Sequence, residues 1–191
     1  MLIAVLPIAV LIFAIWTGAG TMPYDQDFES LNSGNLDGQD GWVGSPVADV
    51  AVEAGAGFGG GKAAVIQATA VTYQGFTNTL GTNIWVEFYT KFTVRAENPS
   101  LENDAAVAFY AKNDGYIYAI SNTSWVALTN TTVGTADWYR VTLNLDYISS
   151  NWSIYISGNG TNTLAATLAE NLKFYDRTAT NRYIRRFKVG N

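Results

Sequence analysis

Hydrophobic and polar positions divide the chain into an apolar N-terminal stretch and a longer part in which they alternate. Residues 1–16 are all apolar, and residues 1–24 contain no charged side chain. About 20 apolar residues in a helix span the roughly 30 Å hydrocarbon core of a bilayer. The pattern therefore predicts a hydrophobic α-helix over residues 1–24, serving as a membrane anchor or an assembly helix, followed by one domain over residues 25–191.

Beyond residue 25 the period changes to two, which is typical of antiparallel β-strands. Polar turns at 113–115 and 147–151 predict two hairpins, because an Asp-Gly step favours a tight turn. A short helical turn is expected only near 169–174. The side chains expected to point into the core are Ile84, Val86, Phe88, Thr90, Phe92, Val94, Tyr139, Val141, Leu143, Leu145, Trp152, Ile154 and Ile156.

Five segments follow one another in an order that resembles that of a known superfamily. They are "DFESLNSGNLDGQDGW", "GGGKAAVIQA", "NIWVEFYTKF", "ADWYRVTLNLDYISSNWSIYISGN" and "YIRRFKVGN". This order is similar to the concanavalin A-like lectin/glucanase superfamily in its LamG-like form, over residues 25–191. The resemblance implies a mainly β, two-sheet antiparallel jelly-roll β-sandwich with adjacent first and last strands. Residues 28–42 would be the first strand and its exit loop, and carbohydrate binding or adhesion at the cell surface would be the function.

Composition narrows the classes of function. The net charge of −5 argues against nucleic acid as a partner, because phosphate binding needs a basic surface. With no Cys and no His, the chain lacks disulfides, thiolate metal sites and the commonest general base. Few charges and many aromatic, Asn, Ser and Thr residues are typical of an extracytoplasmic β protein. We therefore expect a surface protein without enzymatic activity.

The outward positions of the predicted strands form the main candidate binding site. Aromatic rings there would offer a flat surface for glycan rings, with charged and amide side chains supplying hydrogen bonds. The same residues could instead cover an exposed sheet face or contact another protein. The predicted ligand-binding residues are Trp85, Glu87, Tyr89, Trp138, Arg140 and Asn144, with Lys91, Tyr110 and Tyr155 as further candidates.

A carbohydrate-active enzyme is the alternative from another class. Retaining glucanases of the superfamily carry an E-x-D-x-x-E run, since the two catalytic carboxylates must lie about 5–5.5 Å apart. Here Glu87 is followed by Tyr89 and Phe92 at the other two positions. The carboxylate pair is absent, which disfavours catalysis.

Three further sets of residues are candidate sites. No cofactor is expected, although Asp25, Asp27, Glu29 and Asp176 offer oxygen ligands for calcium. A basic patch near the C-terminus could attract anionic headgroups or an acidic partner, or could be a solvated strand face; it comprises Arg177, Arg182, Arg185, Arg186 and Lys188. Glycosylation sequons begin at Asn122, Asn130, Asn151 and Asn159.

The apolar segment favours assembly over simple tethering. A cleaved signal peptide is the alternative, but no Lys or Arg precedes the apolar run. The segment is similar to a type IV pilin N-terminus, with Val5 where that family usually has Glu. We expect a structural or adhesive subunit whose residues 1–24 contact a membrane, hydrophobic subunits or copies of the same chain. A membrane-tethered carbohydrate-binding module is the other interpretation.

Overall fold

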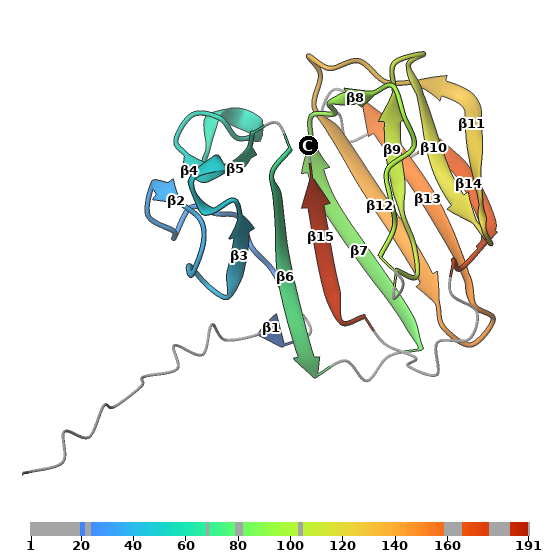
Figure 1. Ribbon diagram of the computed structural model, residues 1–191, viewed down its shortest axis with the longest axis horizontal. Helices are drawn as coiled ribbons and strands as arrows, with labels where there is room; N and C mark the ends of the chain where they lie inside the picture. Colours follow the sequence, from blue (N-terminus) through green and yellow to red (C-terminus); the bar gives the residue numbers. More distant parts are fainter. Residues whose placement is uncertain are drawn as a thin grey trace, which may run out of the picture.

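The chain is mainly β and sandwich-like in a computed structural model that describes residues 20–21, 24–67, 69–78, 82–102, 105–158, 166–175 and 184–190 (Figure 1). Most of the helix predicted over 1–24 lies outside the described residues. Its end does not continue as a helix, because Gly20–Thr21 form strand β1. No described helix has the length and apolar character needed to span a membrane.

One four-stranded antiparallel sheet carries most of the candidate site. It runs in the order β14 (Ala166–Lys173), β13 (Asn151–Gly158), β12 (Tyr139–Asp146) and β7 (Asn83–Thr90). The predicted β12–β13 hairpin and its inward positions are confirmed, since Val141 and Ile154 are fully buried. The helical turn expected near 169–174 is wrong, because most of this segment belongs to β14, whose pairing with β13 provides its hydrogen bonds.

The second sheet has the order β11 (Ser124–Thr132), β10 (Tyr116–Ser121), β9 (Phe109–Lys112) and β8 (Val94–Arg95). The predicted β9–β10 hairpin is confirmed, and Gly115 supplies the left-handed conformation of its turn. β8 pairs with β9 in parallel, which departs from the antiparallel expectation. Val94 was expected inside but is 42% exposed, because it lies beyond the end of β7, on the short strand β8 of the other sheet.

The two sheets pack face to face around the main core (Figure 1). Ile117 and Leu128 of one sheet belong to the same buried cluster as Leu143 and Ile154 of the other. Trp152 is 1% exposed, and its Nε1 donates a 3.1 Å hydrogen bond to the carbonyl of Ile120. Each such buried apolar side chain contributes about 1.5–3 kcal/mol, so this core is the main source of stability.

Strand β6 (Val71–Asn78) connects this sandwich to a smaller lobe. β3 (Trp42–Ser45) and β15 (Arg186–Gly190) pair with the same residues of β6, so they lie on its two edges, and β1 pairs with its far end in parallel. The lobe contains β2 (Gly34–Asn35), β4 (Val50–Glu53) and β5 (Ala63–Ile66), with short 3-10 helices η1 (Val47–Asp49) and η2 (Phe58–Gly60). Its own small core comprises Leu36, Trp42, Val50, Val52 and Ala70.

Residues 28–42, expected to form the first strand and its exit loop, contain little strand. This segment consists of turns, apart from β2 at Gly34–Asn35 and the start of β3. Phe28 and Asp40 both adopt positive φ, which reverses the chain instead of extending it. The segment is nevertheless ordered around an aromatic contact, with the rings of Phe28 and Trp42 5.6 Å apart.

Candidate ligand-binding face

The register of three strands brings most of the predicted site residues onto one outward face. Asn144 pairs with Trp85, Thr142 with Glu87, and Arg140 with Tyr89. On the other side of β12, Thr142 pairs with Tyr155 and Arg140 with Ser157. Directly opposed residues point to the same side of a sheet, so these residues form one surface. We call it the Trp85 face; its residues are Trp85, Glu87, Tyr89, Arg140, Thr142, Asn144 and Tyr155.

Trp85 is the most exposed aromatic side chain of this face. It is 60% exposed, and its ring stacks against that of Tyr155 at a centroid distance of 6.2 Å and an angle of 26°. The Tyr155 hydroxyl donates a 3.2 Å hydrogen bond to Glu170 Oε1, which fixes the orientation of the second ring. Trp85 therefore presents an exposed apolar ring to solvent, and its contact with Tyr155 fixes the orientation of that ring.

Polar groups beside the rings are also held in place. Thr142 Oγ1 donates to Glu87 Oε2 at 3.2 Å, and Asn144 Nδ2 donates to Asn83 Oδ1. A carboxylate and an amide each have several hydrogen-bonding positions, so these contacts leave others available for a ligand. The arrangement can therefore donate to and accept from a polyhydroxylated molecule.

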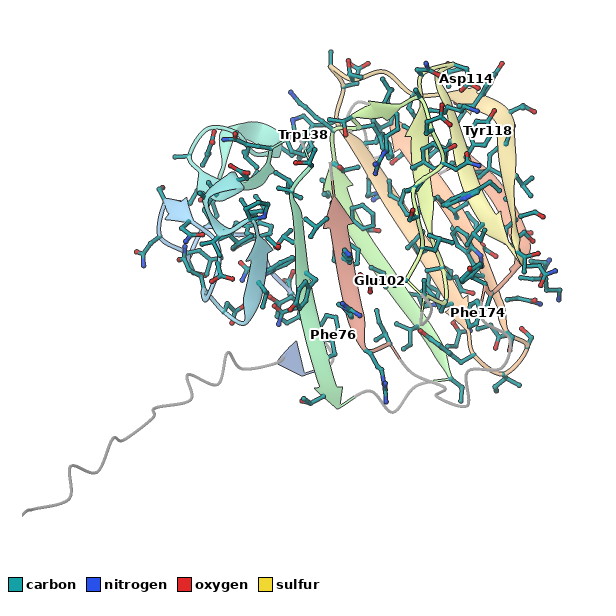
Figure 2. All side chains as sticks on the ribbon, viewed as in Figure 1. Phe76, Glu102, Asp114, Tyr118, Trp138 and Phe174 are labelled. Atoms are coloured by element: carbon teal, nitrogen blue, oxygen red, sulfur yellow. The ribbon has the colours of Figure 1, made fainter. Side chains whose placement is uncertain are left out.

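One aromatic residue of the site was missed from the sequence. Phe58, in the small lobe, stacks on Tyr89 at 4.8 Å and 11° and meets Trp138 edge-on at 6.3 Å. Lys91 Nζ lies 5.5 Å from the ring of Trp138. Figure 2 shows Trp138 where the lobe meets the sandwich. Tyr89 and Trp138 are thus partly covered, and the open part of the face is centred on Trp85.

Tyr110 does not belong to this face. It lies on β9, in the other sheet, and is 7% exposed. Its ring packs against Tyr118 and Trp125 at 5.6 Å and 5.0 Å. Strand alternation predicts the side to which a residue points, but not the sheet to which its strand belongs, which explains the error.

The acidic and basic candidates are mainly engaged in contacts within the protein. Glu29 Oε1 accepts from the backbone N of Lys62, and Asp27 Oδ1 from the backbone N of Glu29; Asp176 lies outside the described residues. The described residues contain no group of three potential metal ligands. In the basic patch, Arg186 and Lys188 both pair with Glu102, and the hydrogen bond from Lys188 lowers the pKa of that carboxyl. Arg185 is described and exposed, whereas Arg177 and Arg182 lie outside the described residues.

The four sequons differ in their surroundings. Asn122 is exposed in the turn between β10 and β11. Asn130 Nδ2, the atom that would carry a glycan, donates to the carbonyls of Thr167 and Leu168. Asn151 Oδ1 accepts from Lys173 Nζ at 2.6 Å. Asn159 lies outside the described residues, so Asn122 has the most accessible amide of the other three.

A scan against protein-family models and searches among curated proteins and solved structures found no match to this chain. Its function is therefore inferred from the geometry of the Trp85 face and from the sequence.

Proposed function

We propose that this is a non-enzymatic, extracytoplasmic surface protein that binds carbohydrate through the Trp85 face. The observation that carries the proposal is the exposed Trp85 ring, stacked on Tyr155 and bordered by polar side chains that hydrogen bonds hold in place. Sugars combine apolar C–H surfaces with a rim of hydroxyl groups, and this face offers a complement to both.

We also propose that the fold is a lectin-like jelly roll of the concanavalin A type. Two sheets packed face to face support this proposal. It is further supported by β1 and β15, the first and last described strands, which both pair with β6. The small lobe would then be an addition to one end of the jelly roll.

Assembly is a second role that one observation favours. Residues 1–24 carry no charged side chain, so this apolar segment can be buried against lipid or against other apolar segments. We propose that it contacts a membrane, hydrophobic subunits or copies of itself, which would display the β domain as a structural or adhesive subunit. Electron microscopy of native full-length material tests this role: filaments or bundled particles support it, and isolated heads on a membrane contradict it.

The carbohydrate proposal is tested by substituting the exposed ring. Trp85→Ala should weaken glycan binding by about 2 kcal/mol, the usual cost of removing a central aromatic contact. Because Trp85 is mostly exposed, the free energy of unfolding should change by no more than about 0.5 kcal/mol. Glycan-array screening followed by calorimetry on the best ligand measures the first quantity, and urea unfolding the second.

Val47→Ala is the matched control, because Val47 is an exposed apolar residue of the small lobe at 44% exposure. It should leave glycan binding unchanged. Equal losses in the two variants, or glycan binding that Trp85→Ala does not affect, would contradict a site at this face.

A further inference from the structure

We infer that the Arg140 end of the Trp85 face binds an oxyanion, so that the saccharide bound there is an acidic oligosaccharide carrying a carboxylate or sulfate group. This inference rests on the proposed function and specifies the class of its ligand.

Two polar atoms at this end are buried without partners, one on the partly exposed side chain of Arg140 and one on the buried Ser157. Nε of Arg140 is buried and has no hydrogen-bond partner among the described residues. Ser157, its direct neighbour on β13, is 4% exposed, and its Oγ likewise has no partner there. Buried polar groups are nearly always hydrogen-bonded in native proteins, since leaving them unpaired is costly. Two such groups side by side on a candidate binding face point to a ligand that pairs with them.

The charge balance at this end is positive. Among the described residues, no carboxylate lies within ion-pair distance of Arg140. Lys91 follows Tyr89 by two residues and lies over Trp138, so a second positive charge occupies the same end of the sheet. A guanidinium presents planar, paired donors that match the geometry of a carboxylate or a sulfate. An anionic group is therefore the best complement to this end of the face.

The spacing indicates an oligosaccharide. Arg140 and Asn144 are four residues apart on β12, which corresponds to about 13 Å at the usual rise of a strand. One sugar ring does not reach from the guanidinium to Trp85, which is paired with Asn144. Glu87 lies on the row between them and would repel a second anionic group there. The acidic unit should therefore sit at the Arg140 end, with neutral units over Thr142 and Trp85.

The test uses full-length protein and oligosaccharides in matched pairs. One arm compares a uronate oligosaccharide with its methyl ester, and the other compares a sulfated galactan oligosaccharide with its desulfated form. Calorimetry should show at least a tenfold preference for the charged member of one pair, and the pair that shows it identifies carboxylate or sulfate as the anion. That preference should decrease as salt concentration rises.

Arg140→Gln should reduce the preference to about twofold or less, while binding of the neutral member, which depends on Trp85, remains. Arg140→Lys keeps the charge without the planar fork and should restore part of the preference. Ser157→Ala should weaken binding of the charged member alone. Arg95→Gln, at an exposed arginine of β8, is the control and should change neither affinity. Thermal unfolding without sugar should show Arg140→Gln at least as stable as the native chain, since it removes an unpaired buried group.

Three results would overturn the inference. Equal binding of charged and neutral members through Trp85 would refute it and leave the proposed function standing. A preference that persists in Arg140→Gln would place the anion elsewhere, with the same consequence. No binding of any saccharide would refute the inference and the proposed function together.

Discussion

At the scale of single residues, Tyr24 connects the start of the β domain to the small lobe. Its hydroxyl donates a 2.9 Å hydrogen bond to Asp40 Oδ2 and accepts one of 3.0 Å from Trp42 Nε1. Its ring also meets Phe76 of β6 edge-on at 5.5 Å. Burial, with the adjacent Asp40 carboxylate, raises the pKa of Tyr24 to about 12. Burial alone raises the pKa of Tyr147, in the main core, to about 12.

These two tyrosines predict a loss of stability at high pH. Below the unfolded pKa of about 10, both states hold the phenolic protons, so stability does not depend on these groups. Between about pH 10 and 12 the unfolded state releases protons that the folded state keeps, and stability falls as pH rises. Urea unfolding across this range should show a smaller fall in Tyr24→Phe and in Tyr147→Phe than in the native chain. Unchanged slopes in both variants would show that these hydroxyls do not control the transition.

The positions of some single residues could be predicted from the sequence, whereas the positions of others could not. Alternation correctly placed Val141 and Ile154 in the core, because it depends only on the local period of a strand. It also placed Trp85 and Arg140 on one face, because the two strands pair in register. Phe58 could not be assigned, since its contact with Tyr89 depends on where a separate lobe packs. No local pattern contains that information.

At the scale of elements, the turn that carries Phe58 is a tightly closed glycine loop. Gly57 N donates to the carbonyl of Gly61 at 2.8 Å, and Gly60 N donates to the carbonyl of Gly57 at 3.0 Å. A Cβ at Gly57 would lie 2.5 Å from the carbonyl oxygen of Lys62, so backbone would have to move. Glu29 fixes the end of the loop through its hydrogen bond to the Lys62 amide. The position of Phe58 over Tyr89 therefore depends on a small residue at 57.

Gly57→Ala should shift this loop and destabilise the fold by about 1–3 kcal/mol, the usual cost of overpacking. The shift should also uncover Tyr89, which iodide quenching or chemical labelling of tyrosine would detect. Gly75→Ala is the control, because Gly75 has negative φ and open space around the new methyl group. That variant should be neutral or slightly stabilising. A Gly57→Ala protein as stable as the native chain would show that the loop adapts without cost.

Local hydrogen bonds explain why residues 28–42 form mainly turns. Residues 28–42 contain enough apolar positions to suggest a strand, yet glycines and acidic or amide side chains at 34–41 cap short turns instead. Asp37 Oδ1, for example, accepts from the backbone N of Gly44 at 2.9 Å. Such side-chain-to-backbone bonds compete with strand pairing, and a hydrophobic pattern does not detect them.

At the scale of the whole molecule, the β domain begins at or before Tyr24, because that side chain is bonded into the lobe. Deletion of residues 1–22 should therefore leave a folded, soluble domain. The matched deletion of residues 1–19 keeps β1 and should be more stable by about 1 kcal/mol, the value of a backbone hydrogen bond or two. Circular dichroism and urea unfolding measure both. Failure of both truncated chains to fold would mean that the apolar segment is part of the domain.

The pairing of β6 has a consequence for the order of folding. The hairpins β9–β10 and β12–β13 join neighbouring segments, so they can form as soon as their own residues are available. β1 and β3 precede β6 in the chain, but the other edge of β6 is paired only when β15 arrives, after all the strands from β7 to β14. Closing the long loop between β6 and β15 is slow, because the chain loses conformational entropy before the pairing of the two strands stabilises it. One edge of β6 therefore stays unpaired through most of synthesis, and the sheet around it completes last.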